Sequence, residues 1–125
     1  MKLLLDSHAY LWWLADDSKL SATAKAAIAD PANSVMVSAA TIWEIEIKRA
    51  VGRLDAGDAD LVAEIAACDF GELPVRAAHA AVAAQLPAHH ADPFDRMLVA
   101  QARIEGLVAV TIDPSFESYE ATTLW

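Results

Sequence analysis

Two aspartates in the stretch HHADPFDRMLVAQA have a type and spacing that could do chemistry. Proline is favoured at the first position of a helix, so Pro93 predicts a helix start with Asp92 as its N-cap. Asp95 then falls in the first turn, on an apolar stripe that Leu98 and Val99 continue. A carboxylate there is costly unless it is paired or bound to a metal. Asp95 is therefore the functional candidate, although the helix N-terminus would also stabilise its charge in a structural role.

Two further acids end short apolar runs. Asp6 closes KLLLD and Asp113 closes LVAVTID, and both runs have the length and composition of buried strands. In an open parallel α/β sheet, ligands bind beyond the carboxyl ends of the strands, so both carboxylates are expected at one edge. An aspartate after a strand is also a common turn or N-cap residue, and for either acid alone that interpretation has about even weight. Together the two acids indicate a carboxylate site.

The stretch VSAATIWEIEIKRAVGRL offers a third acid, either Glu44 or Glu46. Successive helical residues turn by about 100°, so the two side chains point to different sides of the predicted helix. Both border apolar neighbours, and the helical pattern does not choose between them. A surface ion pair with Lys48 is the structural alternative for Glu44, and the pattern alone favours it.

The histidines and tryptophans near these acids have less specific interpretations. His89 and His90 are adjacent in a polar loop, and such histidines are expected to be solvated rather than to bind a metal. Trp12, Trp13 and Trp43 could stack on bases, but tryptophans more often fill a core or an interface. None of these residues is included in the predicted site.

The basic residues are few and scattered. Lys48, Arg49 and Arg53 form a small group that could hold RNA phosphate or an acidic partner, and a solvated helix face is the alternative. Arg96 and Arg103 are expected on the more polar side of the helix that begins at Pro93, opposite the stripe that carries Asp95.

The residues between the acids indicate alternating strands and helices. Strands are predicted at 2–6, 34–38 and 107–113, with shorter ones at 70–74 and in the C-terminal ATTLW. Helices are predicted at 21–30, 40–51, 58–67, 74–86 and 93–106, several of them ending at breakers such as Asp30-Pro31, Gly52 and Gly106. We therefore expect an α/β fold with a mainly parallel sheet, in a single domain over residues 1–125.

Composition and charge limit the function classes. No apolar run approaches the eighteen or so residues of a membrane span, and Asp6 interrupts the N-terminal run too early for a signal peptide. The lone Cys68 forms no internal disulfide, so a cytoplasmic location is expected. A net charge of −9 argues against binding nucleic acid mainly through a broad basic surface. A divalent cation held by carboxylates could still meet a phosphate.

Four blocks together resemble a known family: LLLDSHAYLWWL, VSAATIWEIEIK, DPFDRMLVAQA and VTIDPSFESY. Their order and spacing, over nearly the whole chain, are similar to the PIN domain, and in particular to the VapC-type toxins of prokaryotic toxin–antitoxin pairs. The resemblance implies a PIN-like three-layer α/β/α sandwich and a metal-dependent endoribonuclease site built from four acids. Carried onto this sequence, these are Asp6, Glu44, Asp95 and Asp113. The resemblance thus selects Glu44 over Glu46.

The cofactor implied by this resemblance is Mg²⁺ or Mn²⁺, hard cations that prefer oxygen ligands. We expect Asp6 and Asp95 to anchor the main ion, with Asp113 and Glu44 completing its shell or positioning water. The partners implied are an RNA substrate, a VapB-like antitoxin and a second copy of the chain in a homodimer. Hydroxyl groups near the site are a weaker implication, at Ser7, Ser38 and Thr111.

Two other function classes remain open from the sequence. The first is a phosphotransfer or phosphatase domain with Asp6 as nucleophile, which is weakened because Ser7 and His8 follow in place of a D-x-D arrangement. The second is a non-catalytic binding module whose acids only solvate the surface or cap helices.

Overall fold

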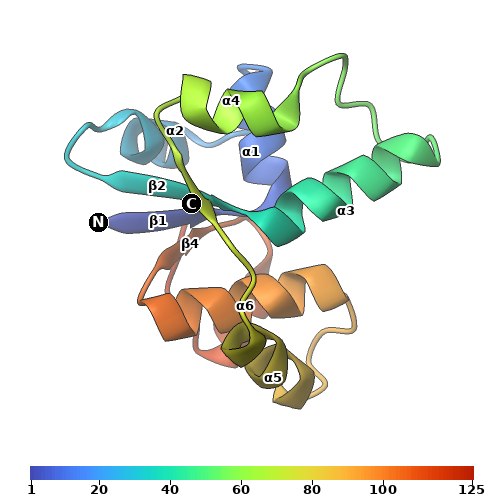
Figure 1. The fold of residues 1–125 in the computed structure, drawn as a ribbon. Helices are drawn as coiled ribbons and strands as arrows, with labels where there is room; N and C mark the ends of the chain where they lie inside the picture. Colours follow the sequence, from blue (N-terminus) through green and yellow to red (C-terminus); the bar gives the residue numbers. More distant parts are fainter.

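A five-stranded sheet with every neighbouring pair parallel forms the centre of the protein (Figure 1). The computed structural model describes residues 1–125, and the strand order is β3-β2-β1-β4-β5. The strands are β1 (Lys2–Leu5), β2 (Ser34–Ser38), β3 (Gly71–Leu73), β4 (Val108–Val110) and β5 (Thr123–Leu124). All five predicted strands are therefore present, and the α/β expectation is confirmed.

The register of the central strands fixes where their polar ends meet. Leu5 pairs with Val37 of β2 and with Val110 of β4. The residue that follows each of these strand positions therefore lies at the same edge of the sheet, and these residues are Asp6, Ser38 and Thr111. The strand ends thus place one predicted site acid and two residues with predicted site hydroxyls side by side at this edge.

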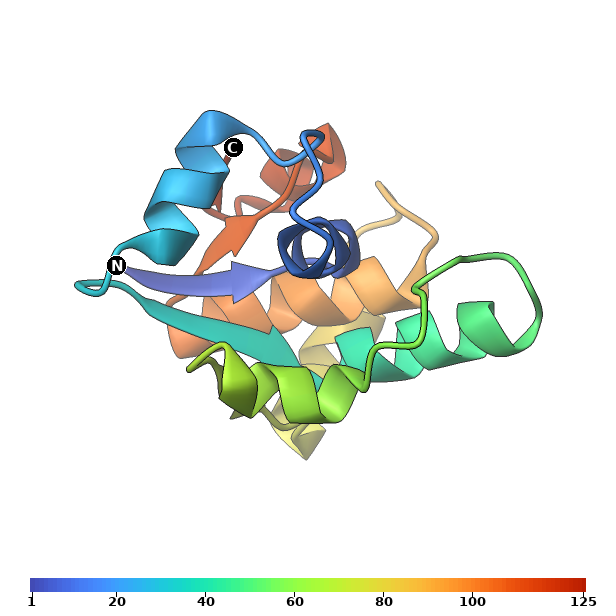
Figure 2. The ribbon, with the colours of Figure 1, turned by 90° about the horizontal axis from the view of Figure 1, so that it is seen from above.

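Helices cover both faces of the sheet and give three layers. The helices are α1 (Ser7–Leu14), α2 (Ala22–Ala29), α3 (Ala39–Ala50), α4 (Leu61–Ala67), α5 (Ala77–Gln85) and α6 (Pro93–Glu105), followed by the 3₁₀ helix η1 (Pro114–Tyr119). Helices α1, α2 and α4 lie over one face and α5 and α6 over the other, while α3 projects outward from the carboxyl edge (Figures 1 and 2). None of the helices is both long enough and apolar enough to span a lipid bilayer.

The central strand β1 explains why the sheet is buried on both faces. Leu3 and Leu5 point to one face, where they join a cluster that includes Tyr10 of α1. Leu4 points to the other face and packs in a second cluster with Leu98 of α6. A strand with helices on both sides is apolar at its buried positions, which is why Leu3, Leu4 and Leu5 form a continuous apolar run rather than an alternation.

Most helix ends lie at the local signals that the sequence predicts, but two helical elements have no such signal. Helix α6 starts at Pro93 and ends at Gly106, whose φ of 67° is the left-handed conformation that glycine adopts without strain. Helix α1 and η1 were not predicted. Each has an aspartate as its N-cap. Only Asp6 separates β1 from α1, so no turn marks that junction, whereas residues 111–113 connect β4 to η1. The sequence of α1, SHAYLWWL, also carries no polar face that would mark a helical period.

Candidate metal centre

Asp6 lies at the start of α1 and is buried, with 5% of its surface exposed. Its Oδ1 accepts a hydrogen bond of 2.8 Å from the N–H of Ala9, which makes Asp6 the N-cap of the helix. Burial raises the pKa of Asp6, and the Thr111 hydroxyl and the Ala9 N–H oppose that rise. The same carboxylate therefore both caps a helix and faces the carboxyl edge of the sheet.

Asp113 has a similar position at the start of η1. Its Oδ1 accepts a hydrogen bond of 2.9 Å from the N–H of Ser115, and its own N–H donates to Thr111 Oγ1 at 3.0 Å. Burial would raise the pKa of Asp113, but the Ser115 N–H and the neighbouring His90 outweigh it and hold the pKa below its usual value. Asp113 is therefore an ionised carboxylate at neutral pH.

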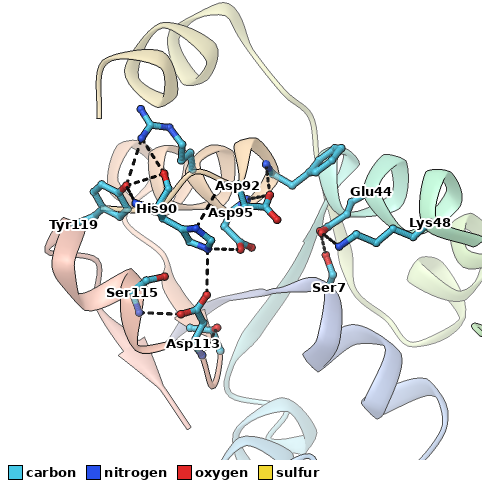
Figure 3. A network of polar contacts seen from close by, with 12 residues as sticks. Ser7, Glu44, Lys48, His90, Asp92, Asp95, Asp113, Ser115 and Tyr119 are labelled. Carbon is cyan, nitrogen blue, oxygen red and sulfur yellow. Dashed lines mark hydrogen bonds and ion pairs between the residues drawn. The ribbon is translucent and has the colours of Figure 1, made fainter. Parts of the chain in front are cut away.

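The two aspartates of DPFDR have different tasks. Asp92 Oδ1 accepts hydrogen bonds from the N–H groups of Phe94, at 2.8 Å, and Asp95, at 3.3 Å, so Asp92 is the N-cap predicted for α6. Asp95 instead points from the first turn of α6 toward Asp113 (Figure 3). The sequence-based distinction between a helix starter and a site-facing acid agrees with this geometry.

The pKa of Asp95 is raised well above the usual value of an aspartate. Burial, the Asp92 carboxylate and the Glu44 carboxylate raise its pKa to about 7, and His90 offsets only part of the rise. The negative charge of Asp95 is thus poorly compensated by the protein. A carboxylate in this condition favours a bound cation, which removes the same repulsion.

Burial separates Glu44 from Glu46, which the helical pattern alone could not do. Glu44 is 4% exposed, and its Oε2 accepts a hydrogen bond of 2.6 Å from Lys48 Nζ while Ser7 Oγ donates to its Oε1. Glu46 lies on an exposed side of α3 and pairs with Arg49. The ion pair with Lys48 expected from the spacing is therefore present, but its acid is buried beside the carboxyl edge instead of solvated on the surface.

His90 is the residue that sequence reasoning missed. Its Nε2 lies 2.8 Å from Asp95 Oδ2 and 3.4 Å from Asp113 Oδ2, so the ring sits between the two carboxylates (Figure 3). One ligand atom from each of these three residues lies within 4.8 Å of the others. The interpretation of both histidines as solvated loop residues is wrong for His90, because contacts distant in sequence fold the loop onto the site.

Arg96 and Tyr119 make those contacts. The sequence predicts Arg96 on the more polar side of α6 but does not reveal its contacts, since its guanidinium turns into the loop that precedes the helix. It donates to the main-chain oxygens of Ala83, Leu86, Pro87 and His90, at 2.7–3.2 Å. The Tyr119 hydroxyl donates to Pro87 O at 2.8 Å and accepts from His90 N–H at 2.7 Å. No local sequence signal marks this network.

The donor set fits a hard divalent cation. Asp95 and Asp113 come together with His90, and Asp6 follows β1 at the same edge of the sheet. The charge of Glu44 raises the pKa of both Asp6 and Asp95. Converging acids with too little positive charge between them are the usual surroundings of Mg²⁺ or Mn²⁺. The closest grouping is Asp95, Asp113 and His90, with Asp6 and Glu44 more deeply buried beside it. The hydroxyls of Ser7 and Thr111 contact these acids, whereas Ser38 caps α3 by accepting from the Ala40 N–H.

A protein-family model for the PIN domain matches residues 3–121. The chain belongs to the PIN domain family. The three-layer sandwich with its parallel sheet is the fold of that family, so the expected fold class is confirmed. A search of curated proteins found no match.

Solved structures of similar fold include several described as toxin–antitoxin proteins. Mycobacterium tuberculosis VapC20, described as a sarcin-ricin loop cleaving toxin, is 20% identical with a TM-score of 0.63, over 93% of each chain. VapBC2 from Rickettsia felis bound to promoter DNA is 11% identical with a TM-score of 0.64, over 99% of this chain and 98% of that one. Mycobacterium tuberculosis VapBC-5 is 22% identical with a TM-score of 0.58, over 98% of this chain and 95% of that one. At these identities the likeness concerns the fold of the PIN domain.

The raised pKa of Asp95 predicts how the stability of the metal-free PIN domain depends on pH. An unfolded aspartate has a pKa of about 3.9, whereas native Asp95 has one of about 7, so the native state binds more protons between these values. Stability is therefore lost as the pH rises from 4 to 7. Asp95→Asn should remove this loss and raise the Tm at pH 8 in EDTA by about 2–6 °C, with a smaller gain at pH 5.

Thermal unfolding followed by circular dichroism checks this prediction. Asp58→Asn is the matched control, because it removes one negative charge from an exposed loop position. An equal gain for both variants at pH 8 would mean that general charge repulsion, rather than the site around Asp95, causes the effect.

Proposed function

We propose that this PIN-domain protein is a Mg²⁺- or Mn²⁺-dependent endoribonuclease, the toxin of a toxin–antitoxin pair. The observation that carries the proposal is the poorly compensated charge of Asp95 facing Asp113 at the carboxyl edge of a PIN fold. The description of VapC20, a protein of similar fold, as a sarcin-ricin loop cleaving toxin supports the choice of RNA as substrate.

Each acid has a separate role in this proposal. Asp6 and Asp95 hold the cation, and Asp113 completes its shell or positions water. Glu44 is held in place by Lys48 and Ser7, so its carboxylate stays fixed beside the site. When bound, a divalent cation supplies the positive charge that activates water and neutralises the leaving oxygen.

The charge distribution favours substrate capture at the cation rather than at a basic surface. The net charge is −9, and two members of the small basic group already have internal partners. Lys48 pairs with Glu44, and Arg49 donates to the main-chain oxygens of Gly57 and Ala59, at 3.3 and 3.1 Å. The proposal therefore assigns the phosphate contact to the metal centre, with Lys48 at its border.

An aspartate-based phosphotransfer reaction fits this arrangement less well. A nucleophilic carboxylate must reach the substrate, but Asp6 is 5% exposed and its Oδ1 already accepts the Ala9 N–H. Trapping of a phosphoenzyme on Asp6 would favour that reaction over hydrolysis of RNA.

RNA cleavage by paired variants tests the assignment of acids. Asp95→Asn and Glu44→Gln should each lower cleavage of tRNA and rRNA pools at least about 100-fold in Mn²⁺ or Mg²⁺, because each removes a charge that the site requires. Asp92→Asn keeps a side chain that can cap α6, and Glu46→Gln changes an exposed side of α3. The cleavage rates of both controls should stay within about fivefold of the rate of the parent protein. EDTA should abolish cleavage by the parent.

Gel analysis of end-labelled RNA provides the measurement. Full cleavage by both Asp95→Asn and Glu44→Gln would refute the four-acid site. Cleavage that persists in EDTA would refute the metal dependence.

A second copy of the chain is the proposed occupant of an apolar face beside the site. Trp43 is 65% exposed, and its ring meets the edge of Phe94 at a centroid distance of 5.3 Å. The two rings line an almost wholly apolar groove of about 440 Å³ with Val75 and Met97. Ile47 and Val51 extend exposed apolar surface along α3, and surface of this kind marks protein interfaces.

Trp43→Glu should convert a homodimer into a monomer, because it places a charge in the centre of this face. Light scattering on a size-exclusion column at about 10–100 μM measures the mass. Val62→Glu is the control, since Val62 is 59% exposed on α4 and lies outside the face. An unchanged dimer in Trp43→Glu would place the interface elsewhere.

A separate groove is proposed to receive the VapB-like antitoxin. It has a volume of about 660 Å³ and lies between α1 and the segment from Leu54 to Ala59. Leu11, Trp12 and Ala56 supply apolar lining. An amphipathic helix that lays its apolar face into such a groove would bury this surface.

Substitution of the exposed groove residue Ala15 tests this surface. An antitoxin encoded by a short upstream reading frame should inhibit RNA cleavage by the parent, and Ala15→Arg should weaken that inhibition at least about tenfold through steric and charge conflict. Ala66→Arg, at an exposed position on α4, should leave it unchanged. Equal inhibition of Ala15→Arg and the parent would place the antitoxin on another face.

A further inference from the structure

The loop that precedes α6 fixes both main-chain polar groups of His90. Its N–H donates to the Tyr119 hydroxyl at 2.7 Å, and its carbonyl oxygen accepts from Arg96 Nη1 at 3.2 Å. The same hydroxyl and guanidinium also bind Pro87 O, so the loop is tied at two places to α6 and η1. The ring of His90 therefore projects toward the carboxylates from a rigid support.

The hydrogen bonds of the ring determine its tautomer. Asp92 N–H donates to His90 Nδ1 at 3.3 Å, so Nδ1 presents a lone pair and the ring hydrogen belongs on Nε2. That hydrogen is donated to Asp95 Oδ2, at 2.8 Å, and Asp113 Oδ2 lies 3.4 Å from the same nitrogen. The nitrogen that faces the carboxylates is consequently a donor and offers no lone pair to a metal ion.

The same contacts leave other carboxylate oxygens for a cation. Asp95 Oδ2 is taken by the imidazole, while Asp95 Oδ1 accepts no hydrogen bond. Asp113 Oδ1 accepts from the Ser115 N–H, and Asp113 Oδ2 faces His90 (Figure 3). An N–H group placed between two such oxygens fixes the distance between the two carboxylates. It also orients the lone pairs that remain free.

We propose that His90 is a positioning residue of the metal centre, which donates Nε2–H to Asp95, lies against Asp113 and does not itself bind the cation. The proposal rests on the metal-dependent function proposed above. It assigns His90 the task that hydrogen-bond partners of ligating carboxylates perform in metal sites, where their loss costs about 10–100-fold in metal affinity. Arg96 and Tyr119 act one step further away, by holding the loop.

Metal titration of full-length protein by calorimetry tests the proposal without reference to cleavage. His90→Ala should weaken Mg²⁺ and Mn²⁺ binding by the same factor, about 10–100-fold, because the carboxylate oxygens that bind both ions become disordered. His90→Gln should recover most of the affinity, since its amide N–H can reach the position of the imidazole Nε2–H. His89→Ala is the matched control at the exposed neighbouring position and should bind like the parent.

Two outcomes would overturn the assignment. A nitrogen ligand favours Mn²⁺ over Mg²⁺, so a selective loss of Mn²⁺ affinity in His90→Ala, without recovery in His90→Gln, would make His90 a direct ligand. Pulsed electron paramagnetic resonance of the Mn²⁺-loaded parent gives an independent reading, because a coordinated imidazole produces a strong ¹⁴N coupling that the proposal excludes. Unchanged affinity in His90→Ala would show that His90 has no role in the centre.

Asp95→Asn in the same titration separates this proposal from the function on which it rests. If the parent binds both ions and Asp95→Asn binds neither, the metal centre stands and the His90 variants decide their own question. If the parent binds no divalent ion, both proposals fail together. Circular dichroism of each His90 variant verifies that the fold is retained, and His90→Gln preserves the test if His90→Ala does not fold.

Discussion

The burial of several carboxylates at one edge of a parallel sheet is the constraint on which the rest of this structure depends. Like charges in a poorly solvated region repel, and each must be met by a donor, a cation or a proton. The register of β1, β2 and β4 sets the common edge. The helices start where their N–H groups can donate hydrogen bonds to the carboxylates. Asp6 and Asp113 accept hydrogen bonds from the helices that they cap, and Glu44 accepts hydrogen bonds from Lys48 and Ser7.

Asp95 differs from these acids because its local donor is already taken. Asp92 occupies the N-cap of α6 and accepts both N–H groups that the first turn offers, including that of Asp95 itself. The cap therefore starts the helix and at the same time adds a second negative charge beside Asp95, which raises the pKa of Asp95. An enzyme site commonly keeps such an unfavourable group because a ligand compensates it. Asp92 thus starts the helix that presents Asp95 and also raises the pKa of Asp95, a condition that favours a bound cation.

The sequence carried the features that depend on local physics. Short apolar strands, the Asp92-Pro93 helix start and the stop at Gly106 follow from backbone preferences, and all are present. Helix α1 was hidden because it follows β1 without a turn and has no polar face. Glu44 was separated from Glu46 by family resemblance and then by burial, since a single helix cannot reveal which face is covered. The position of His90 depends on contacts with Tyr119 and lay beyond any local pattern.

Arg96 shows why such a loop defeats prediction from spacing. A guanidinium has five N–H donors in a fixed plane. Here they meet carbonyl oxygens at the end of α5 and in the loop that follows it, so one side chain supplies hydrogen bonds that a helix or sheet would otherwise supply. The guanidinium of Arg96 binds main-chain oxygens and therefore does not neutralise Asp95. Both residues nevertheless lie in the first turns of α6. The loop gains its shape, and Asp95 gains no ion pair with Arg96. An Arg that paired with Asp95 would instead fill the centre and leave no place for a divalent ion.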